Sequence, residues 1–194
     1  MGNNASNVSF GKPKTGGAIF NAPLGTPLPA NASSELTSAY ACMGHATDDG
    51  LGNNNSASVE KIRAWGGYIV LVAEGEKDDT WKVSLMEILN LDVLKAVYGA
   101  ENVSGTLETG ITIRANSKPK VASVWVFDMS LTNGCMMRVV LPNAVIGEIA
   151  EIPYKDKEAI KYAITLYALP GEDGDTHKEY ILKPTGATGA TSGN

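Results

Sequence analysis

In the second half of the chain, several segments place bulky apolar residues at every second position, the spacing of a β-strand face. Trp125, Phe127, Met129 and Leu131 fall on one face of a strand expected over 124–132, and residues 160–169 alternate in the same way. Asn133-Gly134 predicts a two-residue hairpin turn, because both residues tolerate positive φ. Residues 135–141 are then expected to return antiparallel, with Pro142 ending that strand. This half is predicted to form an antiparallel sheet.

The first half predicts shorter strands separated by polar loops. Strands are expected over 40–46, 59–65, 68–73 and 80–85, and another over 106–114. Gly66-Gly67 predicts a turn between the second and the third of these strands. The segments 48–56 and 74–79 are rich in Gly, Asn and acidic residues, so both are expected to be loops.

A single substantial helix is predicted over about residues 85–98. Ser84 and Glu87 have the spacing of a capping box, and Gly99 follows at a position typical of a helix stop. The apolar residues of this segment cover most of the helix circumference. We therefore expect the helix to be covered on more than one side, by its own sheet and by a neighbouring subunit.

The two ends differ in composition from the middle of the chain. Residues 1–31 contain four prolines and predict an extended N-terminal arm with one short strand over 18–21. Residues 184–194 are of low complexity and predict a flexible tail. Between them, 32–183 form the expected folded domain. The predicted fold class is mainly β: an antiparallel β-sandwich or barrel with one flanking α-helix.

Net charge and cysteine content argue against two classes of protein, those that bind nucleic acid and those stabilised by a disulfide framework. The formal net charge of −5 disfavours a protein that binds nucleic acid by neutralising phosphates. The two cysteines are too few for a disulfide framework, so both Cys42 and Cys135 are expected to be buried in the core. No secretory signal or membrane span is recognisable, so we expect synthesis in the cytoplasm without membrane insertion.

The chain contains few residues in patterns typical of catalytic or metal-binding sites. Cys42 and His45 supply only two potential zinc ligands, and an acidic turn beginning at Asp173 departs from the calcium-loop pattern at Lys178. No catalytic residue, cofactor or metal site is predicted. The three tryptophans could form a carbohydrate platform, but aromatic residues on alternating strands more often lie in a core or an interface.

Four segments together resemble a known family. They are GKPKTGGAIFNAPLGTPLP (Gly11–Pro29), AWGG (Ala64–Gly67), the helix-to-strand block from Asn90 to Asn116, and ALPGEDGDTHKEY (Ala168–Tyr180). In order and spacing they resemble the major tail tube protein of long, non-contractile-tailed (siphovirus) bacteriophages, over residues 7–183.

The resemblance implies a structural virion protein without enzymatic activity. Members form hexameric rings that stack into a hollow tail, through which DNA passes to the host without specific binding. The implied partners are further copies of the chain, the tape measure, the tail terminator and the distal tail protein. Assembly is implied to take place in the host bacterial cytoplasm, and the final location is the virion tail.

Contacts between subunits are expected on the arm, the two polar segments and the helix. The candidate residues are Phe10, Ile19, Phe20, Asp48, Asp49, Leu51, Glu74, Glu76, Asp78, Asp79, Leu91, Val97 and Tyr98. The polar segments are expected to be mobile in a free subunit and to become ordered when rings stack. Deletion of residues 1–20 is expected to leave the sandwich folded and to weaken assembly.

Alternatives from other classes remain open at this point. A carbohydrate-binding or adhesion β-sandwich would place the tryptophans on an exposed face. The tube protein of a contractile tail or a secretion system would share the broad fold. A hydrolase is disfavoured, because no coherent set of nucleophile and base is present.

Overall fold

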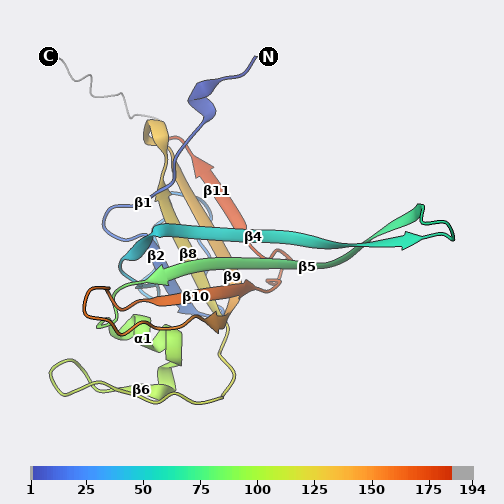
Figure 1. The fold of residues 1–194 in the computed structure, drawn as a ribbon. Helices are drawn as coiled ribbons and strands as arrows, with labels where there is room; N and C mark the ends of the chain where they lie inside the picture. The colour runs from blue at the N-terminus through green and yellow to red at the C-terminus, as the bar shows by residue number, and fades with distance from the viewer. Residues whose placement is uncertain (1, 185–194) are drawn as a thin grey trace, which may run out of the picture.

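The computed structural model describes residues 2–184, and within them one antiparallel sheet dominates (Figure 1). Its strands follow the order β3-β2-β8-β9-β10-β5-β4; β1 adds to β8 and β11 adds to β9. The bounds are β1 Lys12–Pro13, β2 Ile19–Pro23, β3 Ala41–Cys42, β4 Ala46–Arg63, β5 Ile69–Leu85, β8 Ser123–Ser130, β9 Met136–Ile149, β10 Tyr162–Ala168 and β11 Lys178–Leu182. A separate two-stranded sheet consists of β6 Val103–Ser104 and β7 Thr112–Ile113. The helical elements are α1 Leu91–Tyr98 and the short 3₁₀ turns η1 Ala5–Asn7, η2 Ala100–Asn102 and η3 Thr132–Gly134.

The sheet curves strongly around a hydrophobic core. The rings of Trp81 on β5 and Phe127 on β8 stack with centroids 6.3 Å apart, although β9 and β10 lie between these strands in the sheet. A flat sheet would separate β5 from β8 by about 14 Å, since neighbouring strands lie about 4.8 Å apart. The curvature encloses Trp125, Leu141 and Leu166, each 0% exposed. The predicted mainly β, antiparallel fold with one flanking helix is confirmed.

The opposite face of the sheet carries a buried ion pair. The Arg138 guanidinium on β9 donates to both carboxylate oxygens of Asp128 on β8, over 2.6 and 2.7 Å. It also donates to the backbone carbonyls of Asn31 and Ser34, over 3.1 and 2.7 Å. Arg138 is 1% exposed. Because Arg138 contacts both Asp128 of the sheet and the 31–34 segment, it holds that segment against this face.

β4 and β5 form one long hairpin, which corrects the prediction of separate short strands. The segments 48–56 and 74–79, expected to be loops, belong to strands of 18 and 17 residues. Their backbones pair from Leu51↔Val83 to Arg63↔Ile69, and Gly66-Gly67 lies in the turn, as predicted. Asp48 and Asp49 occupy an irregular stretch, since pairing jumps from Ala46↔Leu85 to Leu51↔Val83. The polar composition of 48–56 was misleading because β4 is an edge strand whose side chains are exposed or half-buried, so the strand needs no apolar face.

The helix is shorter than predicted at its start. α1 begins at Leu91, where the Asn90 side chain caps it by accepting from the Asp92 N–H over 3.0 Å. Leu85 instead ends β5 and pairs with Tyr162 of β10, so the Ser84 capping box is not used. Gly99 ends the helix as predicted, with φ of 94°. Val93, Leu94 and Val97 are buried against the chain's own core.

The N-terminal segment folds onto its own subunit. The strand predicted over 18–21 is found as β2, which pairs with β8 from Ile19↔Phe127 to Pro23↔Ser123. Ile19 is only 6% exposed and belongs to the main core. Deletion of residues 1–20 would therefore remove core and sheet residues, and the expectation that it spares the sandwich is wrong. Truncation before Lys12 removes only exposed residues from the described segment 2–11.

Other expected boundaries differ in detail. β9 continues through Pro142, because β8 shifts register between Ser123↔Ala144 and Trp125↔Leu141 and leaves the proline out of the ladder. Asn133 and Gly134 do adopt positive φ, of 60° and 71°, but in a longer turn than predicted. Residues 106–114 form mostly a loop, with only Thr112–Ile113 in a strand. Cys42 is exposed and Cys135 partly exposed, so the prediction of two core cysteines is also wrong.

Candidate assembly interface

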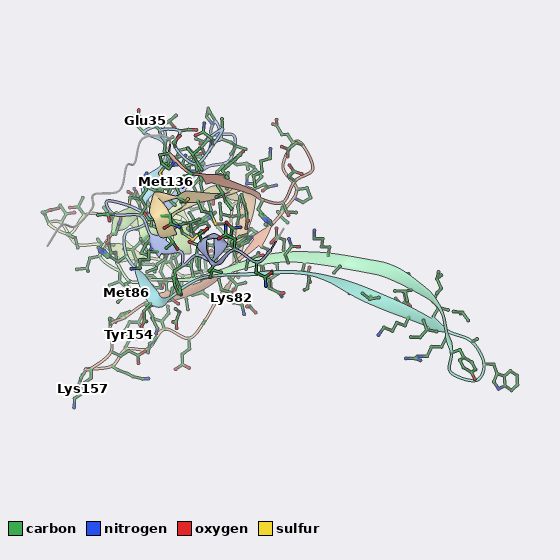
Figure 2. The ribbon with its side chains drawn as sticks, turned by 90° about the horizontal axis from the view of Figure 1, so that it is seen from above. Glu35, Lys82, Met86, Met136, Tyr154 and Lys157 are labelled. Atoms are coloured by element: carbon green, nitrogen blue, oxygen red, sulfur yellow. The ribbon has the colours of Figure 1, made fainter. Side chains whose placement is uncertain are left out.

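The β4–β5 hairpin projects far beyond the body of the molecule (Figures 1 and 2). In Figure 2, Lys82 lies where the hairpin meets the body, whereas Tyr154 and Lys157 lie on another projection, away from the hairpin. β10 pairs with β5 only from Leu85 to Thr80. Within residues 2–184, the outer edge of β4 has no strand partner at all. The hairpin therefore presents free rows of backbone N–H and C=O groups along both of its edges.

Aromatic and aliphatic side chains gather at the tip of this hairpin. Trp65 is 104% exposed and Tyr68 is 77% exposed. Exposed aliphatic residues flank them on both strands: Val59, Ile62, Ile69, Val70, Leu71 and Val72. An exposed apolar cluster of this kind is typical of a surface that a partner covers.

The turn that carries the tip is ordered by its own hydrogen bonds. The Ala64 N–H donates to the Tyr68 carbonyl over 2.9 Å, and the Gly67 N–H donates to the Ala64 carbonyl over 3.0 Å. The Arg63 guanidinium donates to the Gly67 carbonyl over 2.9 Å. Gly66 and Gly67 supply the positive φ values, 105° and 88°, that the turn needs. Trp65 is thus presented on a defined turn.

The root of the hairpin contains a buried carboxylate. The Asp79 side chain is 1% exposed and accepts hydrogen bonds from Asn53 Nδ2 at 2.9 Å, Thr176 Oγ1 at 2.6 Å and His177 Nδ1 at 2.5 Å. A surface cavity of about 350 Å³ adjoins this group and is lined by Asn55, Lys77 and the 174–177 segment. Asp79 belongs to the segment 74–79 that was expected to be a polar loop, and no local pattern in the sequence signals its distant partners.

Burial of Asp79 opposes its ionisation, but the hydrogen bonds from Thr176, His177 and Asn53 outweigh that effect and lower the pKa below its ordinary value. The ionised carboxylate therefore stabilises the fold fully above the ordinary aspartate pKa, and the contribution disappears as pH falls through the lowered value. We expect Asp79→Asn to be less stable than wild type at pH 7 and the difference to shrink as the solution is acidified below the ordinary aspartate pKa. Urea unfolding at several pH values measures this difference. A stability gap that does not change with pH would contradict it.

The structure separates the predicted contact residues into two groups. Ile19, Val97 and Asp79 are buried within the subunit, so their side chains are not available to a neighbour. Partly or fully exposed are Phe10, Phe20, Asp48, Asp49, Leu51, Asp78, Leu91 and Tyr98. Glu74 and Glu76 lie within β5, but their side chains fall outside the described part of the structure. The predicted residues are thus scattered over the arm, the hairpin and the helix.

The apolar hairpin tip is the surface that these candidates missed. Its sequence signal is the apolar run 68–73 after Gly66-Gly67 and the apolar residues Val59, Ile62 and Trp65 before it, a pattern that equally fits ordinary strands. Only the pairing of β4 with β5 over their whole length shows that these runs lie beyond the body. The exposed position of the tip therefore follows from the length of the hairpin and not from any motif.

The structure also bears on the tryptophan platform, the metal sites and the membrane span that the sequence raised. Trp81 and Trp125 are buried at 3% and 0% exposure, as expected for core residues, so an exposed row of three indoles does not exist. Among residues 2–184, no group of three His, Cys, Asp or Glu side chains is arranged to hold a metal ion. His45 Nδ1 lies 2.7 Å from a carboxylate oxygen of Glu87. No helix in the described chain is both long and apolar enough to cross a membrane.

Comparisons with known proteins give one family match. The family profile described as phage tail tube protein matches residues 1–191. Among solved structures, the chain is similar to the cap that terminates the tube of the anti-feeding prophage, with a TM-score of 0.43 and 12% sequence identity over 94% of this chain and 100% of that one. A comparison with curated proteins finds no match.

The family match spans nearly the whole sequence, including the hairpin and the core strands described above. It assigns a structural role in the phage tail. The chain therefore belongs to the phage tail tube protein family.

Proposed function

We propose that this chain forms rings, most simply of six subunits, that stack into the hollow tube of a long, non-contractile phage tail and guide DNA to the host. The observation that carries the proposal is the projecting hairpin with its exposed Trp65 and Tyr68. In a free subunit the apolar side chains of the tip stay in water, so they contribute no hydrophobic stabilisation. A neighbouring subunit that covers it would bury the apolar tip.

The free edges of the hairpin support assembly with further copies of the chain. An unpaired strand edge invites pairing with another strand, and a closed ring leaves no such edge exposed. The outer edge of β4 and the outer half of β5 are both available for this pairing. Strand pairing would join neighbouring subunits, and the tip would reach the next subunit or the next ring.

Net charge supports the proposed passage of DNA. Each subunit carries a formal charge of −5, so a ring of six would carry about −30 before counterions bind. Where acidic residues line the channel, the DNA phosphates are repelled from its wall and adhesion is avoided. Screening limits this repulsion to about 10 Å at 0.1 M salt, a distance that still matters for a duplex in a narrow channel. The tape measure, tail terminator and distal tail proteins are the further partners that this role requires.

Replacing Trp65 tests the role of the tip. We expect Trp65→Ser to raise the protein concentration needed for assembly by about 30-fold, the effect of losing a hot-spot aromatic of about 2 kcal/mol. Tyr154→Ser is the matched control, because Tyr154 is 74% exposed and lies on another projection. Sedimentation velocity over a concentration series measures both variants. Equal assembly of Trp65→Ser and wild type would contradict the proposed role of the tip.

A further inference from the structure

Asp79 marks the point at which the hairpin leaves the body. Asp78 and Lys77, toward the tip, are exposed, whereas Asp79, Thr80 and Trp81 are buried. Pairing of β5 with β10 begins next to it, at Thr80↔Tyr167. Among the described side chains of β5, Asp79 is therefore the last buried one before the unsupported part of the hairpin.

The partners of Asp79 come from a distant part of the chain. Thr176 and His177 follow Asp79 by almost a hundred residues and directly precede β11, which pairs with β9. The His177 ring also packs edge-on against Trp81, with centroids 5.1 Å apart and an interplanar angle of 75°. Asn53 donates to the same carboxylate from β4. The carboxylate thus links both hairpin strands to the segment that leads into β11.

Because the hairpin is long, a small rotation at its root, where Asp79 lies, causes a large displacement of its tip. Ile69, the first residue of β5, lies ten positions before Asp79, a distance of about 33 Å at about 3.3 Å per residue. A rotation of about 10° at the root would therefore move the tip by about 6 Å, more than the spacing of neighbouring strands. No strand of the described chain supports this outer part laterally. Its direction must be set at the root.

We propose that Asp79, held by Thr176 and His177, is a positioning clamp that fixes the direction of the hairpin relative to the body. The consequence for assembly, that the clamp aims Trp65 at its site on a neighbouring subunit, rests on the proposed function. The clamp itself does not, because it acts within one subunit. Asp79 and His177 are positioning residues, and they need not touch a neighbour.

The direct test measures the hairpin direction in dilute, monomeric protein. One spin label is placed on the exposed native Cys42 and a second on Ala64→Cys at the tip, in a Cys135→Ser background. Pulsed electron resonance then reports the distribution of distances between body and tip. We expect one narrow distribution for the otherwise unaltered protein and a broadened or shifted one for Asp79→Asn and for His177→Gln.

Asp78→Asn is the matched control, since it removes the same charge from the adjacent exposed position. Its distance distribution should equal that of the unaltered protein. In Asp79→Asn, amide hydrogen exchange of residues 171–178 should also accelerate by about 10- to 100-fold, as expected for loss of a charged hydrogen bond. Unchanged distances in both Asp79→Asn and His177→Gln, or equal broadening in Asp78→Asn, would overturn the clamp.

The same variants separate the clamp from the proposed function. If Asp79→Asn broadens the distances and weakens ring assembly, both proposals are supported. If it broadens the distances but leaves assembly unchanged, the clamp stands and the proposed role of hairpin direction in assembly fails. His177→Gln keeps the test available if Asp79→Asn does not fold, because it replaces the imidazole that contacts Asp79 and Trp81 at a partly exposed position.

Discussion

Removing the outer hairpin is expected to abolish assembly while leaving a folded monomer. In the shortened variant, Asn-Gly replaces residues 57–77 and joins Ser56 directly to Asp78, which are cross-strand partners in the hairpin. Asn-Gly forms the tight turn that suits a two-residue hairpin connection. None of the described side chains between Ala57 and Lys77 is buried, so the core keeps all of its contacts.

Two measurements distinguish folding from assembly in this variant. Fluorescence of the buried Trp81 and Trp125 reports the core during thermal unfolding, and we expect a cooperative transition close to that of wild type. Sedimentation velocity should then show a monomer at concentrations at which wild type assembles. Rings or tubes formed by the shortened chain would contradict the assignment of the hairpin as the main assembly element.

Arg138→Met is expected to cost about 3–5 kcal/mol of unfolding free energy, the usual effect of breaking a buried ion pair. The substitution leaves the buried carboxylate of Asp128 without its two charged hydrogen bonds. Lys14 cannot replace them, because its ammonium lies 3.5 Å away on a side chain that is 47% exposed. The carbonyls of Asn31 and Ser34 lose their donor as well.

Urea unfolding of single and double variants measures this effect. The double variant Asp128→Leu/Arg138→Met removes both charges and should recover much of the loss, since a packed apolar pair can match a buried ion pair in stability. Lys14→Met is the control for the exposed partner and should have little effect. A loss below about 1 kcal/mol in Arg138→Met, the size expected of a surface ion pair, would contradict the proposed role of Arg138.

Sequence patterns were most informative where a strand packs against a core. Trp125 and Phe127 alternate with Val124 and Val126, and the structure buries these two pairs in different clusters on opposite faces of β8. Tyr162, Ile164, Leu166 and Ala168 likewise share the core face of β10. Burial imposes the alternation, so the alternation predicts the strand. Gly99 was also informative, because its positive φ is a local requirement of the chain.

The long hairpin could not be predicted from the same patterns. Beyond Asp79 both faces of β4 and β5 lie in solvent, so no burial constrains which residues alternate. The run Asn53-Asn54-Asn55-Ser56, at the root of the hairpin, also lies on the exposed edge strand β4 and resembles a loop, although its backbone forms a regular ladder with β5. The Asp79 clamp was hidden for a different reason. Its partners, Thr176 and His177, are brought to it only by the complete fold.

The helix start and Pro142 show how tertiary contacts override local signals. Ser84 and Glu87 have the spacing of a capping box, but Leu85 pairs in the sheet and the strand continues through it. Pro142 has no backbone N–H to donate, yet β9 passes through it because the register shift opposite β8 leaves that position unpaired. In both places the local rule is physically sound but takes no account of the neighbouring strand: β5 extends as far as Leu85, and β9 extends past Pro142.

Sedimentation velocity of the intact chain over a concentration series, with electron micrographs of the same samples, tests the central claim most directly. The account predicts a shift from monomer to rings and longer tubes as concentration rises, with six subunits in each ring. A protein that remains monomeric at every concentration, and that shows neither rings nor tubes in the micrographs, would contradict it.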